Sequence, residues 1–175
     1  VYSNLENMYS VIHQIKVYNN QVWIVNPFNE SSGYVLTSYN LLSGAWSGAN
    51  IHDSFMNTDL NLYVPQEIAF DNSGHLWVGF DYKTSYSEGG IRYLNSNGQF
   101  TEANNDEILV GGKHSDVWSI DICSYNEFDI LWVLSSDGVG GYTILNNSIS
   151  AISSLDYFID IPFFKGDHIR CDQYS

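Results

Sequence analysis

Short runs of alternating apolar and polar residues recur along the chain, and polar turn residues separate them. In residues 67–79, for example, Ile68 and Phe70 alternate with smaller or polar neighbours, Asp71-Asn72-Ser73-Gly74 interrupts the run, and a second apolar run follows. Alternation with a period of two is typical of β-strands with one buried face, and Asp, Asn and Gly favour tight turns between strands. No segment of twelve or more residues keeps apolar positions at helical spacing without a turn residue. The pattern therefore predicts an all-β fold.

The strand pattern is also periodic. Trp23, Trp77 and Trp132 are separated by 54 and 55 residues, and each follows a strand and a turn and precedes a Gly-containing loop and two further strand patterns. Four antiparallel strands per repeat is the content of one β-propeller blade. The sequence predicts a partial propeller over residues 1–175, with about three four-stranded antiparallel blades and the first strand of a fourth: the repeats cover 8–52, 62–104 and 115–153, and a further one starts at 166–175. A β-sandwich whose hairpins share similar turns is the alternative.

The repeat assigns structural roles to particular residues. Trp23, Trp77 and Trp132 are expected at equivalent positions in three successive sheets, where a large flat side chain fills the space between blades. The glycines that recur with them in the turns and third strands are Gly74, Gly90 and Gly141. Trp46 and Trp118 fall outside the repeat position, so we interpret them as candidate rim residues that could stack on a sugar.

The second repeat has the clearest motif. Asp71-Asn72-Ser73-Gly74-His75-Leu76-Trp77-Val78-Gly79, with Gly89-Gly90-Ile91 after it, resembles the two-component-regulator propeller repeat. That repeat occurs in periplasmic sensor halves of hybrid histidine kinases and in secreted or outer-membrane-associated bacterial propellers, including the PorZ-like proteins of type IX secretion. The resemblance implies a propeller of about seven blades and a periplasmic, outer-membrane-associated or extracellular location in a bacterium of the Bacteroidetes type. Trp23-Ile24-Val25 lacks the Gly of this motif, and the third repeat lengthens its turn.

Composition narrows the classes of partner that the chain can bind. The 175 residues include only 6 Lys and Arg but 20 Asp and Glu, for a net charge of −14, which argues against binding to nucleic acid. No apolar run approaches the roughly 18 residues of a membrane-spanning helix. Hydrophobic residues make up 44% of the chain, enough to offset chain entropy and to argue against disorder.

The sequence offers no catalytic constellation. The histidines lack metal-ligand spacing, no Gly-x-Ser-x-Gly is present, and Cys123 and Cys171 have no motif context, so no catalytic, cofactor-binding or metal-ligating residue is predicted. The two cysteines allow one disulfide or none. Two acidic stretches, Asn104–Glu107 and Asp156–Asp160, leave room for a structural calcium ion.

These observations favour a non-enzymatic ligand-binding or scaffolding propeller of a secreted or cell-envelope bacterial protein, of the type IX secretion-associated kind. Its partner, a protein or a carbohydrate, would bind at the propeller face through loops such as 50–62, 81–88 and 103–113. Two alternatives stay open: the sensor propeller of a hybrid two-component histidine kinase that detects an oligosaccharide, and part of a propeller polysaccharide lyase or glycosidase with catalytic residues elsewhere. Since the chain begins at Val1 and ends within a strand pattern, we expect a segment of a longer protein.

Overall fold

The alternating runs form twelve strands in the part of the chain that the computed structural model describes, which comprises residues 12–25, 34–50, 63–82, 90–95, 100–104, 108–109, 112, 115–125 and 128–152. The first sheet contains β1 (Gln14–Tyr18), β2 (Gln21–Val25), β3 (Tyr34–Asn40) and β4 (Trp46–Asn50). The middle sheet contains β5 (Tyr63–Phe70), β6 (Leu76–Tyr82), β7 (Gly90–Leu94) and β8 (Phe100–Glu102). The last sheet contains β9 (Val117–Tyr125), β10 (Phe128–Ser135), β11 (Gly138–Leu145) and β12 (Ser148–Ala151).

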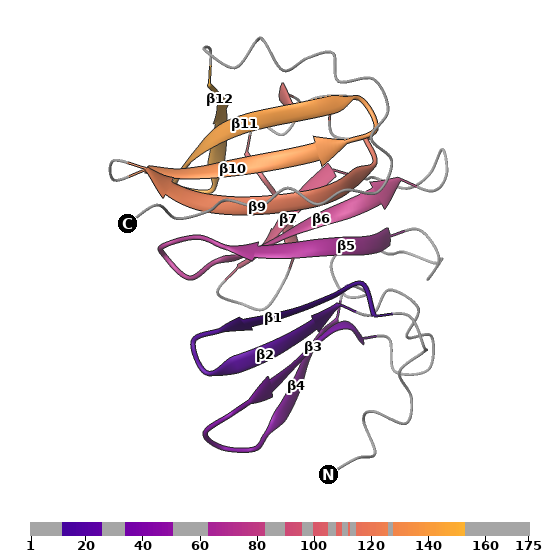
Figure 1. Ribbon diagram of the computed structural model, residues 1–175, viewed down its shortest axis with the longest axis vertical. Coiled ribbons are helices and arrows are strands. Elements are labelled where there is room, and N and C mark those ends of the chain that lie inside the picture. Colours follow the sequence, from indigo (N-terminus) through magenta and orange to yellow (C-terminus); the bar gives the residue numbers. More distant parts are fainter. Residues whose placement is uncertain are drawn as a thin grey trace.

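Each sheet is an antiparallel meander in which neighbours in sequence are neighbours in space. The three sheets stack face to face in sequence order, with the middle sheet between the other two (Figure 1). The prediction of an all-β chain with three four-stranded antiparallel blades is thus confirmed. The expected start of a further repeat at 166–175 lies outside the described residues. No helix in the described ranges is long and apolar enough to cross a membrane.

The first strands of the three sheets converge, as they do around a propeller axis. Lys16 of β1 donates through Nζ to the carbonyl of Ile68 in β5, at 3.3 Å, and to Oδ1 of Asp121 in β9, at 3.2 Å. One side chain can reach both neighbours only if the inner edges of the sheets lie close together. The sheets therefore fan outward from β1, β5 and β9.

The hairpin turns use residues that accept positive φ. Asn19 and Asn20 join β1 to β2 with φ of 46° and 60°, the geometry of a two-residue turn that matches the twist of the strands. Asn146 and Asn147 join β11 to β12 in the same way, with φ of 51° and 61°. Gly74 serves the longer β5–β6 turn, with φ of 82°.

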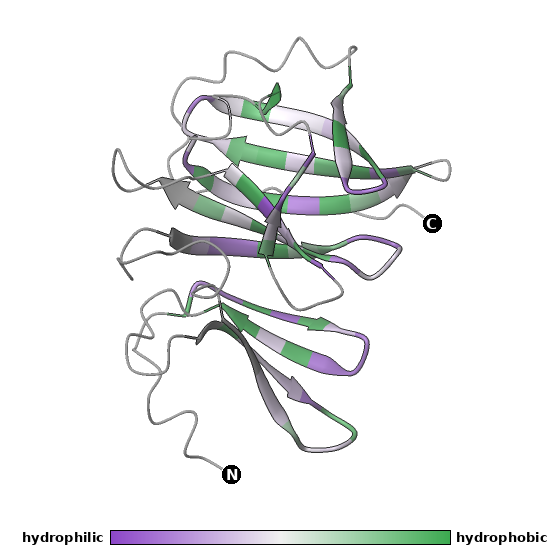
Figure 2. Cartoon of the chain, turned by 180° about the vertical axis from the view of Figure 1, so that it is seen from behind, coloured by the Kyte–Doolittle hydropathy of each residue, from purple (hydrophilic) through white to green (hydrophobic). Residues whose placement is uncertain are grey.

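The three repeat tryptophans occupy the same place in their sheets. Each lies in the second strand, opposite the residue that follows the repeat isoleucine: Trp23 faces Lys16, Trp77 faces Ala69, and Trp132 faces Asp121. Trp77 is fully buried among Ile120, Leu131 and Val133 of the last sheet, and Trp23 packs on Phe70 at 5.8 Å between ring centroids. Each of these two side chains fills the interface with the following sheet. Figure 2 shows hydrophobic segments distributed along the strands of the last sheet.

Gly90 and Gly141, the glycines predicted at the same place in the third strands, do not occupy equivalent positions in the strand register. Gly141 lies opposite Trp132, whereas Gly90 lies opposite Phe80 at the start of β7. The counterpart of Gly90 is Gly138, since both begin a third strand with positive φ, 80° and 135°. In the last sheet a two-residue turn leads directly into the third strand. The residue with positive φ is therefore Gly138, the first residue of that strand, three positions before Gly141.

A recurring hydrogen bond joins the inner strands. Oε1 of Gln14 in β1 accepts the Ile68 N–H at 2.7 Å, and Oε2 of Glu67 in β5 accepts the Ile120 N–H at 3.2 Å. Glu67 also accepts the Ser119 hydroxyl at 2.6 Å. Gln14 and Glu67 precede the repeat isoleucines in their strands, so the same side-chain position links each sheet to the next.

Candidate functional site

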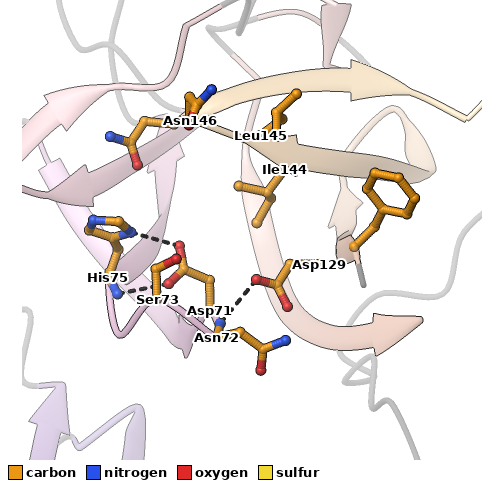
Figure 3. Close-up of a pocket in the computed structure, with 10 residues that line it drawn as sticks. Asp71, Asn72, Ser73, His75, Asp129, Ile144, Leu145 and Asn146 are labelled. Carbon is orange, nitrogen blue, oxygen red and sulfur yellow. Dashed lines mark hydrogen bonds and ion pairs between the residues drawn. The ribbon is translucent and has the colours of Figure 1, made fainter. Parts of the chain in front are cut away.

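A groove lies between the middle and last sheets, on the face of the molecule where the hairpin turns gather (Figure 3). Its volume is about 410 Å³. The β5–β6 turn forms one wall, and the start of β10 with the β11–β12 turn forms the other. The lining residues are Asp71, Asn72, Ser73, His75, Phe128, Asp129, Ile144, Leu145, Asn146 and Asn147.

Asp71 organises the first wall. Its buried carboxylate accepts the backbone N–H of His75 at Oδ1, at 2.8 Å, and the indole N–H of Trp77 at Oδ2, at 2.9 Å. The Nδ1 of His75 lies 3.0 Å from the same Oδ2. Because a carboxylate only accepts, Nδ1 is the donor in this pair. A neutral ring then keeps Nε2 as an acceptor, on a side chain that is partly exposed beside the groove.

Asp129 ties the two walls together. Its Oδ2 accepts the backbone N–H of Asn72 at 3.0 Å, and its Oδ1 accepts the hydroxyl of Ser124 at 3.1 Å. The side-chain amide of Asn72 donates in turn to Ser124 Oγ, at 2.7 Å. Both groove carboxylates therefore have hydrogen bonds that hold the turns in place.

The rim of the groove is apolar and exposed. Phe128 is 52% exposed, and Leu145 across from it is also exposed. Because side chains alternate along a strand, Phe128 and Leu145 lie on the outer face of the last sheet, and Ile144 lies on the face toward the middle sheet, where it is buried. Asn146 lies between Leu145 and His75 (Figure 3). The groove thus combines amide, hydroxyl, carboxylate and imidazole groups, with an exposed aromatic ring at its outer edge.

A second hollow of about 400 Å³ adjoins the groove at the inner edges of the sheets and shares Asp71 and Asn72 with it. The Lys16–Asp121 ion pair and the stacked rings of Tyr18 and Phe70, whose centroids are 4.1 Å apart, lie along it. The remaining lining residues are Ile122 and Ser124. Together the two hollows are lined by residues of all three sheets.

The candidate rim tryptophans lie elsewhere. Trp46 in β4 packs on Tyr39, with ring centroids 4.9 Å apart, and its buried indole N–H has no hydrogen-bond partner among the described residues. Trp118 lies partly buried in β9. Neither residue lines either hollow.

Several expected features fall on residues that are not described. These are most of loops 50–62 and 81–88, much of 103–113, the acidic stretch Asp156–Asp160, and Cys171. Cys123 is a partly buried free thiol. Within the described ranges, no three potential ligands gather where they could hold a metal ion.

The groove was not evident from the sequence. The pattern gave Asp71, His75 and Asn146 only the role of polar turn residues, and it gave Phe128 no role of its own. One signal was available, because Asp71, His75 and Trp77 are close enough along one hairpin for the carboxylate to reach both donors. The opposite wall comes from a hairpin about 57 residues further along the chain, and no local pattern relates the two.

Comparison with known proteins adds little beyond the fold. No protein-family model matches the chain, and no curated protein matches it. Among solved structures, the N-terminal domain of Nup159 is similar, with 11% sequence identity and a TM-score of 0.37 over 79% of this chain and 50% of that one. The chain thus spans half the length of that domain.

Proposed function

We propose that this chain is a non-enzymatic, ligand-binding segment of a β-propeller from a secreted or cell-envelope bacterial protein, and that the groove between the middle and last sheets binds a neutral carbohydrate. The observation that carries the proposal is the set of uncharged amide, hydroxyl and imidazole groups that lines the groove, with the exposed ring of Phe128 at its outer edge. The propeller scaffold follows from the fold. The ligand class, the absence of catalysis and the location are proposals.

The chemistry of the groove fits a sugar. A sugar ring presents an apolar C–H face, which packs on an aromatic ring, and hydroxyl groups, which both donate and accept hydrogen bonds. The side-chain amides of Asn146 and Asn147 and the imidazole of His75 can meet both needs. The expected pose places the sugar hydroxyls between the β5–β6 turn and the amides of Asn146 and Asn147.

Charge restricts the ligand further. The described residues that line the groove include two aspartates and no Lys or Arg, within a chain of net charge −14. An anionic polysaccharide would be repelled unless a cation bridged it. A neutral oligosaccharide has no such penalty.

The resemblance of residues 71–79 to the two-component-regulator repeat supports an envelope location, and a role beside the type IX secretion machinery is the narrower form of this proposal. The same residues form one wall of the groove. The motif of the repeat and the proposed binding surface therefore coincide.

Titration of the purified chain with neutral oligosaccharides, followed by calorimetry, tests the proposal. We expect Asn146→Gly to weaken binding about tenfold, since the loss of one hydrogen-bonding side chain costs about 1.4 kcal/mol and glycine keeps the positive φ of this position. The matched control is Asn19→Gly, which makes the same change at the β1–β2 turn, outside the groove, and should leave affinity unchanged. Binding that survives Asn146→Gly, or the absence of binding to any neutral glycan, would contradict the proposal, and turnover of the bound glycan would contradict its non-enzymatic part.

A further inference from the structure

The second hollow, at the inner edges of the sheets, has walls that lie inside the stack. Tyr18 of β1 stacks on Phe70 at the end of β5, and Ser124 of β9 accepts a hydrogen bond from the side-chain amide of Asn72. Each wall therefore contacts a neighbouring sheet of the same chain, and the hollow does not depend on the two end faces of the stack. Its volume of about 400 Å³ is close to the 410 Å³ of the groove.

This hollow offers an aromatic surface with hydrogen-bonding groups beside it. The ring of Tyr18 lies parallel to that of Phe70, with centroids 4.1 Å apart, and Tyr18 is partly exposed. Its hydroxyl lies against the β5–β6 turn, where a Cβ atom on Gly74 would be 3.5 Å away. The Nζ of Lys16 has three N–H donors, and described carbonyl and carboxylate oxygens accept two of them. An aromatic ring beside such groups matches the apolar face and the hydroxyl groups of a sugar.

The charges in the hollow favour a neutral ligand, as they do in the groove. Nζ of Lys16 and Oδ1 of Asp121 are 3.2 Å apart, so these opposite charges compensate each other. The carboxylate of Asp71 is buried and already accepts three hydrogen bonds. An ionic group of a ligand would have to displace one of these contacts, whereas the hydroxyl groups of a neutral sugar can bind beside them.

Asn72 borders both hollows. Its backbone N–H donates to Asp129 in the groove, at 3.0 Å, and its side-chain amide donates to Ser124 in the second hollow, at 2.7 Å. Both Asn72 and Ser124 are exposed, so accessible polar side chains form the boundary between the hollows. A ligand that occupies the groove can extend across this boundary without entering the hydrophobic core.

We propose that the two hollows are successive subsites for one neutral oligosaccharide, with one sugar unit in the groove and the next beside Tyr18, across Asn72. The inference rests on the proposed function and extends it, because it assigns a chain of at least two sugar units as the ligand. The second subsite adds contacts with Tyr18 and Lys16, so affinity increases with chain length until both hollows are filled. A single sugar in the groove gains nothing from the second hollow.

Calorimetric titration of the 175-residue chain with β-linked glucan, mannan and xylan series, each from the single sugar to the tetrasaccharide, tests the proposal. In a series that binds, we expect the tetrasaccharide to bind about tenfold more tightly than the single sugar, the effect of about one added aromatic contact or hydrogen bond. Tyr18→Leu keeps an apolar side chain on Phe70 and should remove this gain, while the affinity for the single sugar stays unchanged. Asn146→Gly, in the groove, should instead weaken the binding of every length.

Tyr39→Leu is the matched control. Tyr39 also packs on an aromatic ring, that of Trp46, and its hydroxyl also lies 3.5 Å from the place of a Cβ atom on a turn glycine, Gly44. It lines neither hollow, so the dependence of affinity on chain length should persist in this variant. Lys16→Met repeats the experiment if Tyr18→Leu loses its circular dichroism spectrum.

The outcomes separate the second subsite from the proposed function. Equal affinity for all lengths in a series that binds would overturn the second subsite and leave the groove as a site for one sugar. A length dependence that survives in the Tyr18 and Lys16 variants, or an equal loss of affinity at every length, would also overturn it. The absence of binding to all three series would contradict the proposed function and, with it, this inference.

Discussion

Asp71 shows how one side chain can support a surface that it does not itself expose. Its two oxygens receive three donors, which are the His75 backbone, the His75 ring and the Trp77 indole. The same residue thus connects the β5–β6 turn, which forms one wall of the groove, with Trp77, which fills the interface between the middle and last sheets. Loss of a buried acceptor in this position lowers the stability of the fold, because its donors are left without hydrogen-bond partners.

We expect Asp71→Asn to lower the free energy of unfolding by about 1–3 kcal/mol, the usual cost of leaving a buried donor unsatisfied. The asparagine keeps one acceptor oxygen and turns an NH₂ group toward the remaining donors. His75 can respond by moving its hydrogen to Nε2, but the Trp77 indole N–H has no alternative form. Urea denaturation followed by tryptophan fluorescence measures the change. The exposed Asp137→Asn should stay within about 0.5 kcal/mol of the wild type, and an equal loss in both variants would contradict this role for Asp71.

At the scale of strands, side chains of one sheet accept hydrogen bonds from the inner edge strand of the next sheet, where the backbone has no further strand of its own sheet to pair with. β5 and β9 are edge strands of their sheets, so part of their backbone N–H groups point away from the ladder. Gln14 and Glu67 accept one such N–H each, from the next sheet. The spacing between successive sheets is thereby fixed by polar contacts as well as by apolar packing.

Two substitutions at Glu67 test this linkage. Glu67→Leu should destabilise the chain by about 1–3 kcal/mol, since the Ile120 N–H and the Ser119 hydroxyl lose their acceptor. Glu67→Gln should cost less than about 1 kcal/mol, because one amide oxygen can accept both donors, as the amide of Gln14 already does for Ile68. Thermal unfolding of the pair measures the difference. If glutamine cost as much as leucine, the charge of Glu67 rather than its acceptor would be the important feature.

At the scale of the molecule, the described sheets form a linear series in which the middle sheet packs between the other two, and the Lys16–Asp121 pair joins the first sheet to the last at the axis. The middle sheet has a neighbour on both faces, and residues 76–80 of β6 are all buried. β1 has a neighbour on one face and alternates in exposure. Stability in such an array is a sum of sheet and interface contributions.

We therefore expect backbone hydrogen exchange to be slowest in β6 and fastest, among hydrogen-bonded strand positions, in β1. Mass spectrometry of exchanged peptides measures the order. Equal protection of β1 and β6 would show that the three sheets open only as one unit.

Much of the architecture could be predicted from local pattern. Trp23, Trp77 and Trp132 identify the second strand of each sheet because strand, turn and strand are adjacent in sequence and their side chains alternate with a fixed period. The third strands were harder to align: Gly90 and Gly141 share a Gly-Gly pair but differ by three positions in register. The turn before each strand sets that register, and the two turns differ in length.

The sequence by itself determined the β content, the four-strand repeat and the order of the sheets, because these depend on side-chain alternation and turn chemistry between neighbouring residues. Only the tertiary structure decided which surfaces meet. Asp129 reaches Asn72 and Lys16 reaches Asp121 across 57 and 105 residues, and the contrast between Ile15 and Ile68 depends on whether another sheet packs against the strand. These contacts arise from the stacking of whole sheets, and a repeating sequence pattern looks the same whether or not a neighbour is present.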